Sequence, residues 1–327
     1  MASSRLPKVF AVKAIPPAGL ARLRQHCQVT VNEKKGWPTR EDLLQGVRGM
    51  DALFVFPFVK IDREVLDVAG PQLKIVATHS VGLEHIDLEL CKERGIKVSY
   101  TPDVLTTATA ELAVSLVLAT ARRLDECFCA VKEGVWGTCW ENSLWLLGKQ
   151  ISGSVVGIVG LGRIGLAIAK RLAAFEVSKI VYTGRTPRPE SAAAVGAEFV
   201  SFDELCKQSD FVVASCSVNE SNKNLFNREA FKKMKPTSIF VNVARGVIVD
   251  QEALYEALAS GEIGAAGLDV TNPEPLPPSD PLLTLPNCLI VPHIGSLTDT
   301  TRKIMCDLVV DNILAGVEGR PIISPAF

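Results

Sequence analysis

The chain has 327 residues, of which 47% are hydrophobic and 22% charged, and its formal net charge is -1 at pH 7. This length predicts two domains, and the composition is typical of a soluble globular protein. The near-neutral charge excludes a global field for nucleic acid or an anionic membrane, and no apolar run approaches the ~18 residues of a membrane span.

Short apolar strands alternate with helices over the first hundred residues. We expect strands at 8–12, 28–31, 52–56, 74–78 and 96–100, and helices at 18–26, 40–47, 62–68 and 88–94. This alternation predicts a parallel sheet with helices on both faces. Because the chain enters the first strand almost at once, its N-terminus does not resemble a signal peptide.

A long helix rich in Ala, Leu and Val is expected at 105–123. Its all-round apolar character indicates burial between domains or subunits, and it favours a homodimer. Residues 136–145 follow with three of the four tryptophans. This segment is interpreted as a packed arm or a subunit contact.

A second alternating unit begins at Ser154. We expect strands at 155–159, 179–182, 211–215, 238–243, 265–270 and 288–291, with helices at 164–174, 202–207, 251–260 and 299–315. The last helix is long enough to return to the first domain. The pattern predicts two doubly wound parallel-sheet domains, with residues 107–298 inserted into a domain of residues 1–106 and 299–327.

The nine cysteines are scattered, and only Cys127 and Cys129 stand close together. Structural zinc needs two such pairs or pairs of Cys and His, so no metal site is expected. Unpaired thiols are typical of a reducing compartment, which favours a cytoplasmic enzyme.

A glycine signature, Gly160-x-Gly162-x-x-Gly165, follows the strand at 155–159 and opens the next helix with Arg163 and Ile164. That context is what a dinucleotide loop requires. The glycines permit a tight turn, close backbone approach to the pyrophosphate and close packing of helix on strand. The helix N-terminus adds N–H groups and a positive dipole.

The end of the next strand indicates which cofactor binds. An NAD site usually places an acid about 20 residues along to hold the ribose 2′-hydroxyl. Here the sequence gives Gly184, Arg185, Thr186 and Arg188, with no acid before Glu190. Two arginines and a hydroxyl favour a 2′-phosphate, so NADPH is predicted, with NADH weaker. The alternative is a loop of solvated charges.

Seven segments occur in order: Ser80-Val81-Gly82, Thr109-Ala110-Glu111, the glycine signature, Asn242-Val243-Ala244-Arg245-Gly246, Gly267-Leu268-Asp269-Val270, Asn272-Pro273-Glu274-Pro275 and Pro292-His293-Ile294-Gly295-Ser296. Together they resemble the D-isomer-specific 2-hydroxyacid dehydrogenases. Three segments are similar to the glyoxylate reductase/hydroxypyruvate reductase group of that family: Tyr100-Thr101-Pro102-Asp103-Val104-Leu105, Tyr182-Thr183-Gly184-Arg185 and Gly267–Leu276.

This resemblance implies that residues 107–298 are a Rossmann-type NAD(P)-binding domain, inserted into a flavodoxin-like substrate (catalytic) domain of residues 1–106 and 299–327. It also implies a catalytic trio. His293 would give a proton to the carbonyl oxygen, and Glu274 would hydrogen-bond the imidazole and favour its protonated form. Arg245 would pair with the substrate carboxylate, a task that suits its planar fork. The structural alternatives are an exposed acid for Glu274 and an ordinary salt bridge for Arg245.

The resemblance also implies supporting contacts. The N–H groups of Val81 and Gly82 would bind the substrate carboxylate from the other domain. Asp269 would accept from the nicotinamide carboxamide, and Ser217 and Val243 would border the cofactor. Ser296 would contact substrate or cofactor. Trp140 would either cap a neighbouring subunit's substrate pocket or pack structurally.

The implied reaction is hydride transfer from NADPH to the C2 carbonyl of a small 2-keto acid, glyoxylate or hydroxypyruvate, in a cleft that closes. Two alternatives remain open. The same fold serves NAD(H)-sensing corepressors, and other D-2-hydroxy acids could be the substrates. Formate dehydrogenases carry Gln beside the catalytic His, so Glu274 argues against them.

Overall fold

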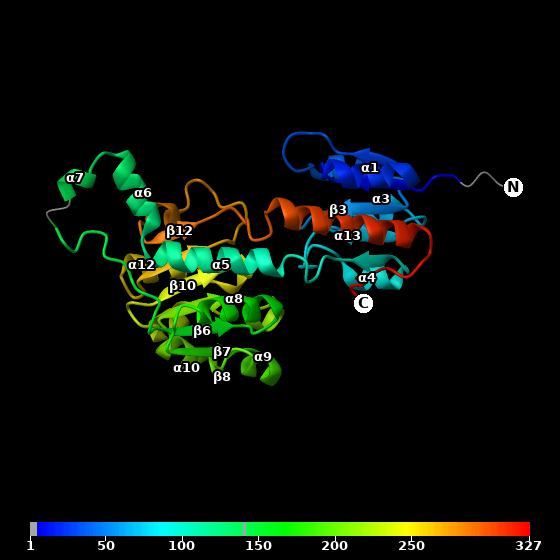
Figure 1. The fold of residues 1–327 in the computed structure, drawn as a ribbon. Coiled ribbons are helices and arrows are strands. Elements are labelled where there is room, and N and C mark those ends of the chain that lie inside the picture. The colour runs from blue at the N-terminus through cyan, green and yellow to red at the C-terminus, as the bar shows by residue number, and fades with distance from the viewer. Residues whose placement is uncertain (1–4, 140–141) are drawn as a thin grey trace. The chain divides into compact units, whose positions relative to one another are not determined.

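The computed structural model describes residues 5–139 and 142–327. The chain forms two compact units: unit 1 is Met1–Leu105 with Ser296–Phe327, and unit 2 is Thr106–Gly295. Each is built on one sheet of parallel strands (Figure 1), so the expected pair of parallel α/β folds is confirmed. Which unit holds the cofactor and which the substrate stays a prediction.

Unit 1 contains a five-stranded sheet in the order β2-β1-β3-β4-β5, which is the order of flavodoxin-like folds. Its strands are β1 (Lys8–Ala11), β2 (Gln28–Val31), β3 (Ala52–Val55), β4 (Ile75–Thr78) and β5 (Lys97–Ser99). Its helices are α1 (Pro17–His26), α2 (Arg40–Gly46), α3 (Arg63–Ala69), α4 (Leu88–Glu93) and α13 (Asp299–Val317). All five strands were expected, with small shifts at their ends.

Local sequence fixes where several helices of unit 1 begin. The side chains of Thr39, Asp62 and Asp87 each accept a hydrogen bond from a backbone N–H in the first turn of α2, α3 and α4. Such caps satisfy donors that have no partner inside the helix. The strands before these helices, such as β3 and β4, are buried at every residue, as a sheet covered on both faces requires.

The final helix, α13, packs into the same hydrophobic core as the N-terminal strands of unit 1. It packs against β3, β4 and β5 and against α1, and Figure 1 draws it in red. Val309, Val310 and Ile313 are buried with the strands of unit 1. The C-terminal segment is therefore part of the first fold.

Unit 2 contains a seven-stranded parallel sheet in the order β12-β11-β10-β9-β6-β7-β8, a Rossmann order extended by one strand. The strands are β6 (Val155–Val159), β7 (Lys179–Thr183), β8 (Ala197–Phe199), β9 (Phe211–Ala214), β10 (Ile239–Asn242), β11 (Ala265–Leu268) and β12 (Cys288–Ile290). The helices are α5 (Thr106–Ala121), α6 (Leu124–Lys132), α7 (Trp136–Cys139), α8 (Arg163–Ala173), α9 (Pro189–Ala193), α10 (Phe202–Gln208), α11 (Arg228–Lys233) and α12 (Gln251–Ala259).

The apolar helix α5 serves as a core helix of unit 2. It packs against α8 and against β10, β11 and β12, which accounts for its apolar character without a second domain or subunit. Edge strand β8 was not expected, because its three residues are largely exposed and form no apolar run. Within the described residues, no helix has the length and apolar character needed to cross a membrane.

A buried histidine links β4 to α13 in unit 1. Arg302 donates from Nη1 to His79 Nδ1 at 3.1 Å, and the other ring nitrogen, Nε2, lies 3.4 Å from the Arg302 carbonyl oxygen. The ring stacks on Phe54, with centroids 5.9 Å apart. Burial, and secondarily the Arg302 guanidinium, lower the pKa of His79 from 6.5 to about 4. The imidazole is therefore neutral near pH 7.

We expect His79 to make the protein less stable as the pH falls from 6.5 to 4. In this window the unfolded chain binds a proton at His79 and the folded chain does not, so the full stability is present above 6.5 and about 3 kcal/mol is lost by pH 4. Urea unfolding of wild type and His79→Met across this range measures the slope. An equal slope in both proteins would contradict the prediction.

Candidate active site

The predicted proton donor and its carboxylate partner are in direct contact. His293 follows β12, Glu274 follows β11, and His293 Nδ1 is hydrogen-bonded to Glu274 Oε1. Both side chains are partly exposed, at 29% and 25%. Because a carboxylate only accepts, Nδ1 donates, and the ring presents Nε2 on its opposite side. This is the arrangement in which a carboxylate orients an imidazole for proton transfer.

Asp269, the residue after β11, holds the loop that carries His293. Its carboxylate accepts from the N–H of Ile294 at 2.6 Å and of Gly295 at 3.0 Å. The N–H of His293 donates to the Asp269 carbonyl at 3.0 Å, and His293 itself has a φ of 52°. Burial raises the pKa of Asp269 from 3.8 to about 6. These contacts show Asp269 as a loop anchor, and its contact with nicotinamide stays a prediction.

Arg245 follows β10, and the buried side chain of Asn242 shapes its loop. Asn242 Nδ2 donates to the Arg245 carbonyl at 3.0 Å, and Oδ1 accepts from the N–H of Ala244 at 2.9 Å. The Arg245 guanidinium donates to the Ala244 carbonyl at 2.8 Å. A role for Asn242 was not predicted from the sequence, although its place in the motif was a signal for one.

The next residue, Gly246, brings the Arg245 loop against the loop that leads to Glu274. A Cβ at this position would lie 1.9 Å from the Thr271 carbonyl oxygen, so no other residue fits. β10, β11 and β12 are consecutive in the sheet, and each is followed by one member of the trio. The fold therefore gathers Arg245, Glu274 and His293 at one edge of unit 2, the carboxyl ends of parallel strands, where such folds bind ligands.

The glycine loop between β6 and α8 has the shape that a dinucleotide needs. Gly160 has a φ of 96°, and a Cβ there would lie 2.6 Å from Cys216 Cα. A Cβ on Gly165 would lie 2.0 Å from the Gly160 carbonyl oxygen, whereas one on Gly162 would meet open space. Ser215 Oγ donates to the same carbonyl at 2.9 Å, a contact that was not predicted from the sequence.

The first turn of α8 has the features of an anion-binding helix N-terminus. Gly162 is its N-cap, without a side-chain cap and without an acid in the first turn. The helix presents backbone N–H groups and a positive dipole to this loop. Ser217 follows β9 and Val243 follows β10, the strands next along the same edge. The residues present therefore fit a dinucleotide.

The predicted 2′-phosphate loop follows β7 and is exposed. Arg185, Thr186 and Arg188 all lie at the surface, and the N–H of Arg188 donates to the buried Tyr182 hydroxyl at 2.9 Å. Neither arginine side chain has an ion-pair partner in the part of the chain that the structure describes. This loop thus presents two cations on an anchored backbone.

The predicted carboxylate loop, Val81 and Gly82, follows β4 in unit 1. Across residues 5–139 and 142–327, no group accepts a hydrogen bond from either N–H. Unpaired adjacent N–H groups are the donors that anion-binding loops use. Ser296 is where the chain re-enters unit 1, and its carbonyl accepts from the N–H of Thr298 at 3.0 Å. Trp140 lies outside the described residues.

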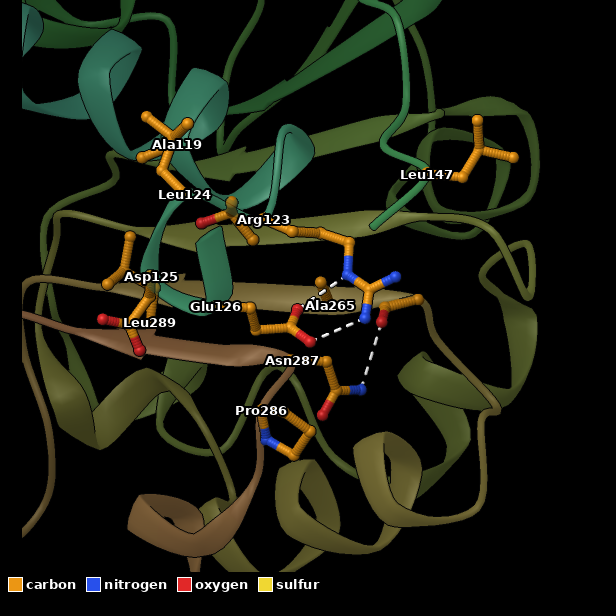
Figure 2. Close-up of a pocket in the computed structure, with 12 residues that line it drawn as sticks. Ala119, Arg123, Leu124, Asp125, Glu126, Leu147, Ala265, Pro286, Asn287 and Leu289 are labelled. Carbon is orange, nitrogen blue, oxygen red and sulfur yellow. Dashed lines mark hydrogen bonds and ion pairs between the residues drawn. The ribbon is translucent and has the colours of Figure 1, made fainter. Parts of the chain in front are cut away.

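A separate cavity of unit 2 lies away from this chemistry. Figure 2 shows Arg123 paired with Glu126 beside Asn287. Ala265 begins β11 and Asn287 precedes β12, so the cavity is at the amino ends of these strands. It is therefore not the site of the trio. No group of three His, Cys, Asp or Glu side chains among the described residues is placed to hold a metal ion.

Comparison with known proteins gives a consistent result. Residues 114–295 match the family model of the D-isomer specific 2-hydroxyacid dehydrogenase NAD binding domain. The chain is 51% identical to a glyoxylate reductase/hydroxypyruvate reductase from Homo sapiens, covering 98% of each chain. It is 46% identical to a glyoxylate reductase from Thermococcus onnurineus, covering 96% of this chain and 93% of the other.

A solved structure is similar over the whole chain. It is an NADPH-dependent glyoxylate/hydroxypyruvate reductase from Sinorhizobium meliloti in complex with NADP and malonate. The TM-score is 0.84 at 33% sequence identity, with 98% of this chain and 97% of the other covered.

Proposed function

Because the chain belongs to the D-isomer-specific 2-hydroxyacid dehydrogenase family, we propose that it reduces small 2-keto acids with NADPH, glyoxylate to glycolate and hydroxypyruvate to D-glycerate. The observation that carries the proposal is the trio at the carboxyl edge of unit 2, on the same sheet as the glycine loop. The names of the similar enzymes support the substrate class.

Each residue of the trio has a distinct task. A nicotinamide cofactor held at the glycine loop would supply the hydride. Arg245 holds the substrate carboxylate and draws electron density toward the carbonyl oxygen. His293 gives its proton to that oxygen as negative charge develops, and Glu274 keeps the ring oriented through Nδ1. Val81 and Gly82 supply two further N–H donors for the carboxylate.

The direct test is the oxidation of NADPH and NADH with glyoxylate, hydroxypyruvate, pyruvate and a bulky keto acid. We expect the highest kcat/KM with NADPH and one of the first two. A chain that oxidised neither cofactor with any keto acid would overturn the proposal and support the corepressor alternative. A preference for the bulky acid would support another D-2-hydroxy acid as the product.

The preference for NADPH rests on Arg185, Thr186 and Arg188. We expect Arg185→Ala combined with Arg188→Ala to weaken NADPH binding by about 10²-fold, because two charge-assisted contacts to the 2′-phosphate are lost, while NADH binding changes little. Fluorescence titration measures both dissociation constants. The control, Arg228→Ala combined with Lys232→Ala, removes two exposed cations of α11. Equal losses for NADPH and NADH would refute the assignment.

A homodimer is part of the proposal. On α6, Leu124, Phe128 and Val131 are 42%, 64% and 57% exposed, and their spacing puts them on one helix face. An exposed apolar face of this kind marks an interface, and a second copy of the chain in a two-fold dimer is the commonest occupant. Light scattering after gel filtration should give the mass of two chains, and the mass of one chain would contradict the dimer.

We also propose that the enzyme is cytoplasmic. The thiols of Cys91, Cys206 and Cys306 are free and buried, and burial raises their pKa to about 12. Free thiols persist in a reducing compartment. Cell fractionation tests this, and recovery with a membrane-enclosed organelle would contradict it.

A further inference from the structure

A chain of side-chain hydrogen bonds ends on the carboxylate loop of unit 1. His85 Nε2 lies 2.9 Å from Thr78 Oγ1, and Thr78 Oγ1 lies 2.9 Å from Ser80 Oγ. Ser80 Oγ lies 2.7 Å from the Gly82 carbonyl oxygen. Four groups, from the last residue of β4 to the loop that follows it, are thus joined in sequence.

The chemistry of these groups sets the direction of donation. The Gly82 carbonyl only accepts, so Ser80 donates to it. A hydroxyl has one hydrogen, so Thr78 must donate to Ser80, and His85 must donate to Thr78 through Nε2–H. All three hydrogen bonds therefore point the same way, and each polarises the next.

The hydrogen-bonded groups of Thr78, Ser80 and Gly82 are shielded from water. Thr78 is fully buried, Ser80 is 7% exposed, and Gly82 is buried. The Ser80 carbonyl is held as well, because it accepts from the N–H of Thr101 at 2.9 Å. A lost hydroxyl would leave buried partners unsatisfied instead of hydrated.

We propose that Thr78 and Ser80 are positioning residues for the keto-acid carboxylate, because they fix the backbone whose Val81 and Gly82 N–H groups receive it. This inference rests on the proposed function and deepens it. The Ser80 and Gly82 carbonyls are held by internal partners, and the Val81 and Gly82 N–H groups have no acceptor in the described part of the chain. The two donors are therefore set before the substrate arrives. A preorganised anion site loses no binding free energy to ordering the loop.

The test compares variants that remove or keep one hydroxyl. Ser80→Ala removes the hydroxyl that donates to the Gly82 carbonyl. Its control is Ser99→Ala on neighbouring strand β5, because the Ser99 hydroxyl is also buried but has no hydrogen-bond partner among the described residues. Thr78→Val breaks the chain at constant shape, and Thr78→Ser keeps the hydroxyl. The probes are glyoxylate as substrate and oxamate, a keto-acid mimic that is not reduced.

We expect Ser80→Ala and Thr78→Val each to raise the KM for glyoxylate and the inhibition constant of oxamate about tenfold, in parallel, with smaller changes in kcat. NADPH affinity should stay at its wild-type value. Ser99→Ala and Thr78→Ser should match wild type in all four quantities.

Two outcomes would overturn the inference. Ser80→Ala could match Ser99→Ala, or the variants could lose kcat, NADPH affinity and melting temperature together, as a merely structural role predicts. Failure of the proposed function is a different result, because wild type itself would then not reduce glyoxylate.

Discussion

Replacement of His293 by alanine is expected to lower kcat by about 10³- to 10⁴-fold, the usual contribution of a positioned general acid. Without the imidazole, the developing alkoxide must take its proton from water. The glycine loop lies at β6 and the histidine after β12, separate parts of unit 2, so the variant should bind NADPH as wild type does. Stopped-flow turnover and fluorescence titration measure the two quantities.

The Glu274→Gln variant provides the matched control for this prediction. Glutamine keeps an acceptor for His293 Nδ1 but lacks the negative charge, so kcat should fall less than in His293→Ala. Turnover of His293→Ala within tenfold of wild type would remove His293 from the mechanism.

The Arg245→Ala variant is expected to lower kcat/KM for glyoxylate by on the order of 10²- to 10³-fold, because a desolvated substrate carboxylate would lose its charged partner. The loop itself should persist. Asn242 holds it through the Ala244 N–H and the Arg245 carbonyl, which are backbone groups that the substitution leaves in place. Steady-state kinetics and the melting temperature measure the two effects.

Arg245→Lys separates charge from shape at this position. Lysine keeps the charge but cannot form two parallel hydrogen bonds to a carboxylate, so it should restore only part of the activity. An unchanged kcat/KM in Arg245→Ala would show that another group binds the carboxylate.

The fold was largely predictable because its central strands are apolar on both faces and alternate with helices. Strand β8 escaped prediction because it is short and exposed at the sheet edge, so no apolar run marks it. Helices α6 and α11 were not predicted. The side chain of Asn227 caps α11 by accepting a hydrogen bond from the N–H of Ala230, whereas α6 has no side-chain cap. The burial of α5 was predicted, but the elements that cover it were not. An apolar pattern shows that a helix face is covered, but it does not show which element covers that face.

The residues of the candidate site could be predicted from the sequence, but not all of the contacts that hold them in place. The motifs named Arg245, Glu274 and His293, and strand order brings them to one edge. The contacts that support them were not predictable. Asn242, Ser215 and the Thr78–Ser80 hydroxyls act through hydrogen bonds whose partners depend on loop conformation, which residue type alone does not specify.

The position of β12 in the sheet of unit 2 also affects the order in which the protein loses its functions as it unfolds. The strand β12, which precedes His293, has three residues and lies at one of the two edges of the sheet, where β11 is its one neighbour among the described strands. A short strand with one neighbour has few contacts, and segments with few contacts open at a lower free energy than the core of a sheet. A molecule in which β12 has frayed still carries the glycine loop, because that loop follows β6 in the middle of the sheet. Such a molecule would hold its cofactor but could not use it, so loss of reduction should precede loss of cofactor binding when the protein is gently destabilised.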